Sequence, residues 1–389
     1  MKKSRNVQTK RIISWPLEML LRLFGIWPGV SYSQFCKVFW LIIMITNTSL
    51  QLLFLIMHAR TINFTMVIYV FAATLALGMK LIKIAIFWFN QRRFNEMWKT
   101  MSTNWERGSD YTDAVGATGK KQIMHYMPNF IVAFNLFSVM MTSFSSLSAG
   151  IHYDEASNAT RPYVLWMYLP FDVNKHSVYL LVIFLQFFYL FILSAGAATI
   201  NSVLIILMLY LGDQIDIICK CLTEMPQEEN ESSTNVTMLK KIIRKHQNVI
   251  AFSENVESVY TYIALMLLLF NTLITCGLGF ILVTSIGSPN FSKMMKKNLM
   301  FYCVMNIESF VFCFAGEYIR AKSREIGDAA YSSPWYQSKF HGRAVLFMIM
   351  RSQNQLTITM GKFVDLSLEL FSTIVKTSAS YVSVLLAMY

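Results

Sequence analysis

The chain has 389 residues, of which 55% are hydrophobic and only 14% are charged, and its mean hydropathy is positive. This composition excludes a disordered chain and an ordinary soluble protein, and it indicates a membrane protein with several spans. The formal net charge of +12 does not indicate binding of nucleic acid, because the Lys and Arg residues are scattered in short segments between apolar runs and form no basic domain.

Seven apolar runs are long enough to cross a hydrocarbon core of about 30 Å, which takes about 20 helical residues. They cover residues 34–57, 64–89, 127–149, 177–211, 259–286, 298–319 and 364–389. The fourth run has no charged residue from Ser177 to Gly212 and is longer than one crossing, so we expect its helix to project out of the lipid. The sequence therefore predicts an all-α, polytopic membrane protein with seven transmembrane helices.

The positive charges are distributed unevenly between the two sides of these spans. Most of the 34 Lys and Arg residues lie before the first span or after the second, fourth and sixth. Because positively charged loops stay in the cytoplasm, we predict a cytoplasmic N-terminus and an extracellular C-terminus. A G-protein-coupled receptor has the opposite orientation. In this topology Asn158, in the sequon Asn158-Ala159-Thr160, lies outside the cell and is a candidate for glycosylation.

The charged residues of the second and sixth apolar runs include Lys80, Lys83 and Glu308. Lys80 and Lys83 are near the inner end of the second run, where we expect their amino groups to snorkel to the cytoplasmic interface. Glu308 is near the middle of the sixth run, where an isolated carboxylate is costly. Two hypotheses remain for Glu308: a structural hydrogen bond to another helix, and a contact with a ligand or ion.

The last run has two different faces when it is drawn as a helix at about 100° per residue. One face is small and largely hydroxylated, and it carries Thr373, Lys376, Thr377, Ser380, Ser383, Val384, Ala387 and Met388. The opposite face is apolar apart from Ser378. The first face fits either close helix packing or a water-filled path, and Lys376 favours the path, because close packing tolerates a charge poorly. One helix cannot enclose a pore, so a path requires several copies around an axis.

The chain carries no arrangement of residues typical of a catalytic site. Its six His residues include no pair with metal-ligand spacing on one helix, and it has no nucleophile elbow and no phosphate-binding Gly-rich loop. We therefore predict that the protein is not an enzyme and uses no cofactor or metal. A membrane transporter is a less favoured alternative, because paired broken spans in matching halves are not seen.

The residues from about 316 onward resemble the insect odorant receptors. The stretch GEYIRAKSREIGDAAYSSPWYQ (316–337) is similar to the segment after the sixth span in that family, and residues 343–389 are similar to its closing segment. Weaker similarity is found at WMYLPFD (166–172) and HQNVIAFSENVES (246–258). The gustatory receptors are the near alternative, but their closing pattern is absent. The long insertion of the family's co-receptor before the fifth span is absent as well.

This resemblance implies a tuning subunit of a ligand-gated, non-selective cation channel in the plasma membrane of olfactory sensory neuron dendrites. Such a subunit binds a small, volatile, apolar odorant and assembles with co-receptor subunits into a heterotetramer. The resemblance implies one domain over residues 1–389. It has a cytoplasmic N-terminal segment at 1–33, a cytoplasmic anchor at 321–362 and a pore helix at 364–389.

The resemblance also implies the positions of functional residues. Matching the ending SYVSVLLAMY to the family places the pore gate at Val384 and Met388, one helical turn apart, with Thr373, Thr377 and Ser380 lining the deeper pore. Met388 departs from the shorter residues usual there. The odorant pocket is expected in the outer half, among spans two, three, four and six, and should be mostly apolar and aromatic. Its candidate residues are Tyr69, Ala73, Phe137, Met141, Phe144, Phe184, Phe188, Tyr302 and Met305.

Overall fold

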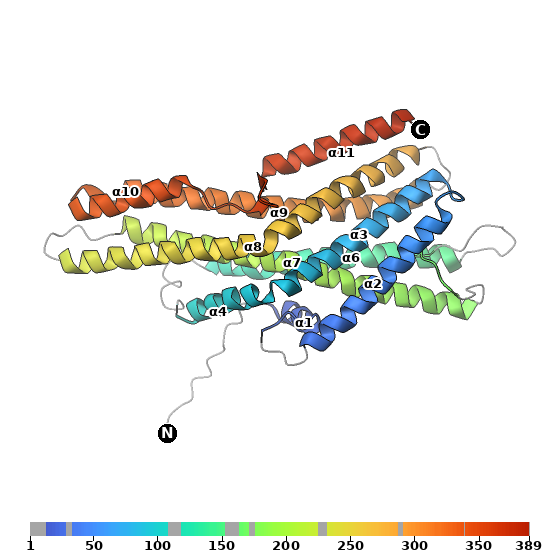
Figure 1. The fold of residues 1–389 in the computed structure, drawn as a ribbon, viewed down its shortest axis with the longest axis horizontal. Helices are drawn as coiled ribbons and strands as arrows, with labels where there is room; N and C mark the ends of the chain where they lie inside the picture. Colours follow the sequence, from blue (N-terminus) through green and yellow to red (C-terminus); the bar gives the residue numbers. More distant parts are fainter. Residues whose placement is uncertain are drawn as a thin grey trace, which may run out of the picture.

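The structure is a computed structural model that describes residues 13–28, 33–107, 118–151, 163–170, 176–224, 232–286, 291–337 and 339–388. These residues are almost entirely helical (Figure 1). The helices are α1 (Trp15–Leu23), α2 (Ser33–His58), α3 (Phe64–Phe89), α4 (Gln91–Arg107), α6 (Thr118–Ile151), α7 (His176–Thr223), α8 (Ser232–Thr284), α9 (Phe291–Ser332), α10 (Lys339–Gln353) and α11 (Leu368–Met388). A 3-10 helix, η3 (Trp335–Gln337), and a hairpin of β1 (Thr359–Met360) and β2 (Val364–Asp365) complete the described elements.

Within the described ranges, seven helices are long and apolar enough to cross a membrane: α2, α3, α6, α7, α8, α9 and α11. The predicted all-α fold with seven spans is confirmed, and the chain is a multi-pass membrane protein. Helices α7, α8 and α9 have 48, 53 and 42 residues. At a rise of about 1.5 Å per residue, each is about twice as long as a hydrocarbon core of about 30 Å is thick. The projection expected for the fourth run is found in α7, and α8 and α9 project as well.

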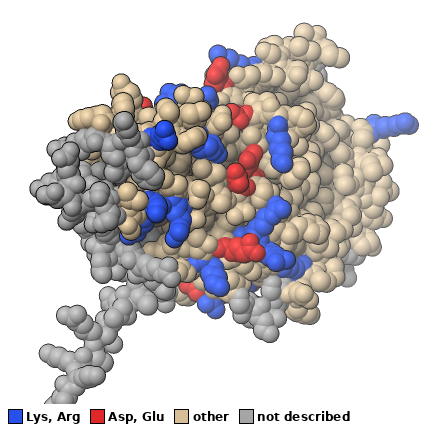
Figure 2. Space-filling view, turned by 60° about the vertical axis from the view of Figure 1, so that its left-hand side comes forward, with Lys and Arg blue, Asp and Glu red and all other residues tan. Residues whose placement is uncertain are grey.

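The projecting helix ends gather at one end of the molecule, together with α4 and α10 (Figure 1). Lys and Arg side chains with interspersed Asp and Glu are visible on this end in Figure 2. In the projecting part of the bundle, Lys322 on α9 forms ion pairs with Asp216 on α7 at 3.0 Å and with Glu325 at 2.7 Å. The charged end fits the predicted cytoplasmic side, and the C-terminal end of α11 lies at the opposite end of the bundle (Figure 1).

The final span begins later than the sequence predicted, because the first residues of the apolar run form β2 and a helix cap. Gly361 and Lys362, in the hairpin turn, have φ values of 59° and 66°, a left-handed conformation that Gly adopts without strain. The amide of Gly361 donates to the carbonyl of Thr261 on α8 at 3.1 Å. The hydroxyl of Ser367 then accepts the amide of Leu370 at 3.1 Å and caps α11. The hairpin therefore fixes the start of α11 against α8.

Helix α7 lies at the centre of the bundle and packs against α3, α6, α8 and α9. Its run of small residues, SAGAAT (194–199), is buried and lets neighbouring helices approach closely. At Gly196 an added Cβ would lie 2.4 Å from the ring of Phe24, so the segment after α1 fits directly against this backbone. Helix α11, in contrast, lies at the edge of the bundle and packs mainly on α8 and α9. The bundle thus has a closed centre, and α11 is a peripheral span.

The topology can be tested with an epitope tag placed after Tyr389. We expect antibody staining of intact cells that express the tagged chain, because an odd number of spans separates a cytoplasmic N-terminus from the C-terminus. A second chain tagged before Met1 is the control and should stain only after permeabilisation. The reverse pattern would contradict the predicted orientation and would match that of a G-protein-coupled receptor.

Candidate functional site

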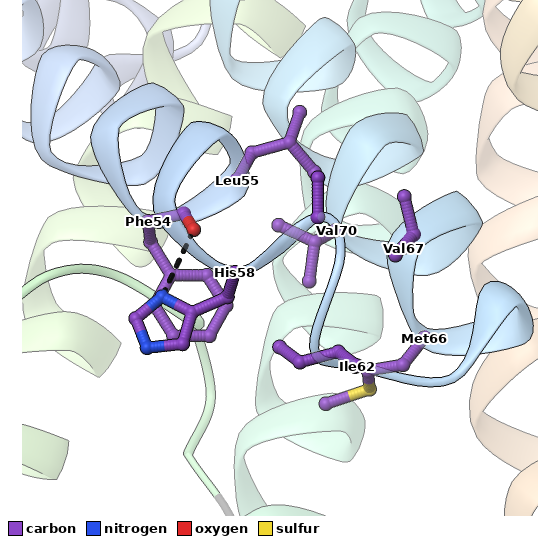
Figure 3. Close-up of a pocket in the computed structure, with 8 residues that line it drawn as sticks. Phe54, Leu55, His58, Ile62, Met66, Val67 and Val70 are labelled. Carbon is purple, nitrogen blue, oxygen red and sulfur yellow. Dashed lines mark hydrogen bonds between the residues drawn. The ribbon is translucent and has the colours of Figure 1, made fainter.

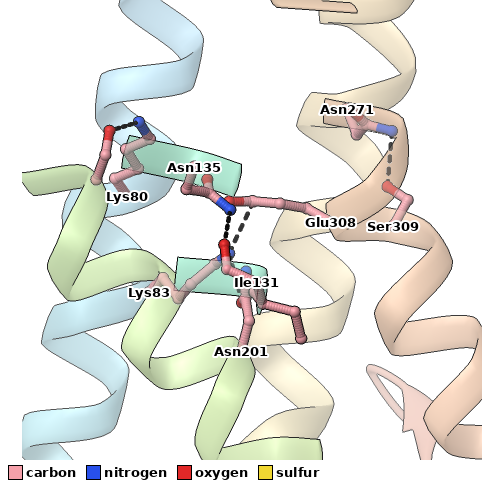
Figure 4. Close-up of polar contacts among 9 residues, drawn as sticks. Lys80, Lys83, Ile131, Asn135, Asn201, Asn271, Glu308 and Ser309 are labelled. Carbon is pink, nitrogen blue, oxygen red and sulfur yellow. Dashed lines mark hydrogen bonds and ion pairs between the residues drawn. The ribbon is translucent and has the colours of Figure 1, made fainter. Parts of the chain in front are cut away.

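The interior of the bundle holds a set of polar side chains that lie deep within the apolar spans (Figure 4). They share almost complete burial and come from six different helices. The set comprises Lys80, Lys83, Asn135, Ser194, Asn201, Asn271, Thr275, Glu308, Ser309 and Ser378. Hydrocarbon offers no hydrogen-bond partner, so these groups are stable only where they find partners within the protein.

The strongest contact in this set is an ion pair between Lys83 on α3 and Glu308 on α9. The amino group of Lys83 lies 3.0 Å from Oε2 of Glu308, and each side chain is 1% exposed. The same amino group donates to Oδ1 of Asn201 on α7 at 3.1 Å and lies 5.7 Å from the centre of the Phe312 ring. The amino group of Lys83 therefore connects α3 with α7 and α9.

This ion pair corrects the sequence prediction for the two lysines. Neither amino group snorkels to the interface: Lys83 pairs with Glu308, and Lys80 donates to the hydroxyl of Ser194 on α7 at 2.6 Å. The structural hypothesis for Glu308 is the one that the geometry supports, because a helix–helix contact satisfies one carboxylate oxygen. The other oxygen, Oε1, and Nδ2 of Asn201 are buried and have no hydrogen-bond partner among the described residues.

A second group of contacts continues from α9 to α11. The amide of Asn271 on α8 donates to the hydroxyl of Ser309 at 2.6 Å, and Ser309 is the residue next to Glu308. One turn along α8, the hydroxyl of Thr275 lies 3.0 Å from that of Ser378 on α11. Ser378 is the only buried residue among the described residues of α11. The buried polar contacts thus run from α3 and α7 through α9 and α8 to the last helix.

Helix α11 turns the two faces predicted from the sequence in different directions. Ile374, Ser378 and Val382 recur at four-residue spacing, are buried or half-buried, and lie on the side that packs on α8 and α9. The hydroxylated face is exposed on the single chain, apart from the half-buried Thr377. In a membrane such a face lies against water or another protein chain rather than against lipid.

The residues predicted to form the gate and line the pore lie on this exposed face. Val384 is 57% exposed and Met388 is 82% exposed. Thr373 and Ser380 are exposed as well, and their hydroxyls donate to carbonyls of their own helix at 3.0 and 3.2 Å. The structure places the five residues together on one side of α11, and all of them except the half-buried Thr377 are exposed on the single chain.

The residues predicted to form the odorant pocket are not brought together in the same way. Met305 on α9 is buried, and Tyr69, Ala73 and Tyr302 are half-buried. The other five candidates, on α6 and α7, have exposed side chains in the single chain: Phe137, Met141, Phe144, Phe184 and Phe188. A large apolar side chain gains as much from lipid as from the interior of a membrane protein, so aromatic character alone does not mark the inside. These five therefore line no enclosed cavity within the single chain.

A small apolar pocket lies elsewhere, at the connection between α2 and α3 (Figure 3). Its lining includes Phe54, His58, Ile62 and Val70, and the His58 ring stacks on the Phe54 ring at 4.5 Å between centres. The space suits about one water molecule and is too small for an odorant.

Two further points concern other predicted sites. Asn158 lies outside the described residues. Among the residues that the structure does describe, no three His, Cys, Asp or Glu side chains come close enough to hold a metal ion.

Sequence reasoning missed Asn201, Asn271 and Thr275, which take part in the buried contacts. Asn201 and Asn271 are amides in the middle of apolar runs, and that position is the signal that could have identified them. Thr275 gave no such signal, because Thr is common in membrane helices and can bond its own backbone.

The chain is similar in sequence to known receptors. Residues 63–379 match the family model described as 7tm Odorant receptor. Odorant receptor 13a of Drosophila melanogaster is 23% identical over 322 residues, which cover 77% of this chain and 75% of that relative. Odorant receptor 67c of the same species is 24% identical over 234 residues, which cover 58% of this chain and only 55% of that relative.

The fold is also similar to a solved structure. It matches the insect olfactory receptor OR5 of Machilis hrabei with a TM-score of 0.75 and 16% identity, over 96% of this chain and 97% of the other. The same receptor in complex with eugenol matches with a TM-score of 0.74 and 15% identity. At this level of identity the similarity is one of fold.

The ion pair between Lys83 and Glu308 generates a stability prediction. Glu308→Gln should lower the free energy of unfolding by about 3–5 kcal/mol, because it leaves the Lys83 charge buried without a counter-charge. The double variant Lys83→Met with Glu308→Leu should recover most of this loss, since it removes both charges. Thermal melting of the purified protein in detergent measures the effect.

Glu325→Gln is the matched control on the same helix, because Glu325 is partly exposed and pairs with Lys322 in the charged end. Its effect should stay below about 1 kcal/mol. A Glu308→Gln variant as stable as the wild type, or a double variant no better than the single one, would show that the buried pair does not hold the helices together.

Proposed function

The chain belongs to the 7tm odorant receptor family, a family of receptors and not of enzymes, and on this premise we propose that it is the odorant-binding subunit of a ligand-gated, non-selective cation channel. The subunit assembles with co-receptor subunits into a heterotetramer in the plasma membrane of olfactory sensory neuron dendrites. The observation that carries this proposal is the exposed hydroxylated face of α11.

The pore assignment follows from the environment of α11. In the apolar 18-residue stretch of this span, only 6% is buried in the single chain, the lowest share among the seven described spans. Its exposed face carries the charged Lys376 and several hydroxyls, a composition that lipid does not solvate. Several such helices around an axis place these groups in water. Val384 and Met388 then form an apolar ring that closes the path by dewetting, and Thr373, Thr377 and Ser380 keep water in the deeper vestibule.

The assembly proposal rests on the projecting end of the chain. Leu346, Phe347 and Met350 on α10 and Tyr331 on α9 are exposed, although these helices extend beyond the length of one membrane crossing. Apolar side chains exposed together outside lipid are typical of a surface that binds another protein chain. We assign the predicted anchor, residues 321–362, to contacts with the co-receptor subunits.

The odorant site is proposed in the outer half of the bundle, between α3 and α9. Tyr69, Ala73, Tyr302 and Met305 are the candidates that are buried or half-buried, and they offer the apolar and aromatic surface that a small volatile molecule needs. Lys297 on α9 lies 5.0 Å from the centre of the Tyr69 ring. The complex of the Machilis hrabei receptor with eugenol, a receptor of the same fold, supports an odorant as the ligand class.

A chemoreceptor that signals through a G protein, or a gustatory receptor, is the alternative. Recording currents from cells that express this chain with and without a co-receptor separates these functions. We expect an odorant-evoked cation current that requires the co-receptor and persists when G-protein turnover is blocked. A current abolished by that block would favour the alternative, and a full response from this chain alone would contradict the obligate heteromer.

The gate assignment predicts a change in permeation. Val384→Ser or Met388→Ala should alter the conductance, the ion selectivity or the resting leak by about twofold or more, because an apolar ring is widened or hydrated. The effect should be graded, since the co-receptor subunits contribute the rest of the ring. Single-channel recording and reversal potentials measure it, and the odorant rank order should stay unchanged.

Val375→Ser is the matched control, because Val375 is half-buried on the opposite side of α11. It should leave ion selectivity unchanged. Wild-type permeation in both gate variants, with normal surface expression, would mean that the exposed face packs against protein and lines no pore.

A further inference from the structure

The last helix is held to its own bundle by one buried polar contact. The hydroxyls of Thr275 on α8 and Ser378 on α11 lie 3.0 Å apart, and Ser378 is the only buried residue in the described part of α11. One turn further along both helices, an added Cβ on Gly279 would lie 2.9 Å from Cγ2 of Val382. The absence of a side chain on Gly279 thus lets α11 approach α8 closely at this point.

The hydrogen bonds at this contact cannot all form at once. Thr275 can donate to the carbonyl of Asn271 at 2.7 Å, and Ser378 can donate to the carbonyl of Ile374 at 2.9 Å. Each hydroxyl carries a single hydrogen, so a bond between the two hydroxyls requires one of them to give up its own carbonyl. When the contact opens, the hydrogen that joined the two hydroxyls returns to the carbonyl of its own helix, and neither hydroxyl is left without an acceptor.

This property separates the hydroxyl pair from the other buried contacts. Breaking the pair of Lys83 and Glu308 leaves two uncompensated charges, and separating Asn271 from Ser309 leaves amide hydrogens of Asn271 without an acceptor. Asn271 lies one turn before Thr275 on α8, so the firm contacts hold that part of α8 in place. The bundle therefore combines central contacts that cost much free energy to break with the contact of Thr275 and Ser378, which opens at a low free-energy cost.

We propose that the pair of Thr275 and Ser378 is a reversible latch that positions the pore helix, formed in the arrangement seen here and released when α11 moves during gating. Thr275 and Ser378 are positioning residues in this proposal, since neither contacts the odorant nor the permeating ion. The inference rests on the proposed channel function, but the position of α11 can also be measured without any current.

The first test is electrophysiological. Thr275→Val and Ser378→Ala, expressed with the co-receptor, should each shift the resting current and the odorant EC50 together by about threefold to tenfold, the range expected for one hydrogen bond between membrane helices. The sign of the shift reports whether the latched arrangement is the closed or the open one. The double variant should shift no further than either single variant, because both remove the same contact.

Thr272→Val is the matched control. Thr272 lies on the same helix, is half-buried, and donates to the carbonyl of Leu268 on its own helix at 2.7 Å rather than to α11. This variant should leave both quantities unchanged. An equal shift in the control, no shift in either latch variant, or additive shifts in the double variant would overturn the proposal.

The second test measures the distance between α8 and α11 directly. In the variant Gly279→Cys with Val382→Cys, the two thiols lie close enough for a disulfide, and its rate of formation under mild oxidant is read on gels after site-specific cleavage. Adding Thr275→Val should slow this rate about threefold or more, whereas adding Thr272→Val should not. The single variant Val382→Cys controls for pairing with native cysteines.

The two tests fail independently. If no combination of subunits carries an odorant-evoked current, the proposed channel function is refuted, while the disulfide rate still decides whether the hydroxyl pair holds α11 against α8. If currents are present and the disulfide rate is the same with and without Thr275, the latch is refuted and the channel function stands.

Discussion

Polar groups inside a membrane must satisfy one another, and this constraint organises the bundle. Lys83 and Glu308 lie on helices far apart in the sequence, yet each is stable in the interior only because the other is there. The requirement fixes α3, α7 and α9 relative to one another, since the same lysine also binds Asn201. Large apolar side chains carry no such requirement, so residues such as Phe144 and Phe184 are left on the outside.

The same reasoning explains how much of the fold could be predicted. The seven spans follow from hydropathy, because the transfer of each segment from water into hydrocarbon depends on that segment's own length and composition. The continuation of α8 and α9 beyond the membrane could not be predicted in this way, since it depends on packing among α7, α8, α9 and α10. The hairpin before α11 was missed for a similar reason: its contacts with Thr261 connect residues about 100 positions apart.

The candidate site was predicted unevenly. The two faces of α11 could be read from periodicity, because hydroxyls and apolar residues alternate there at helical spacing. The odorant pocket could not, since a chain with 30 Phe and 25 Met offers such residues on every face and lipid accepts them as readily as protein does. The lysines were misassigned because their distance from the span end suggested snorkelling, and only the fold shows that Glu308 lies within reach.

The energies of the buried contacts suit a ligand-operated protein. A ligand shifts a conformational equilibrium only by its difference in affinity for the two states, which for a small odorant amounts to a few kcal/mol. Breaking a buried ion pair costs about 3–5 kcal/mol, which is as large as this difference in binding free energy. A hydroxyl pair between membrane helices contributes only about 0.6 kcal/mol. A movement that kept Lys83 paired with Glu308 and opened only the contact of Thr275 with Ser378 would need less free energy than odorant binding supplies. The placement of α11 at the edge of the bundle, with a single buried residue, is consistent with this division between a rigid centre and a movable last helix.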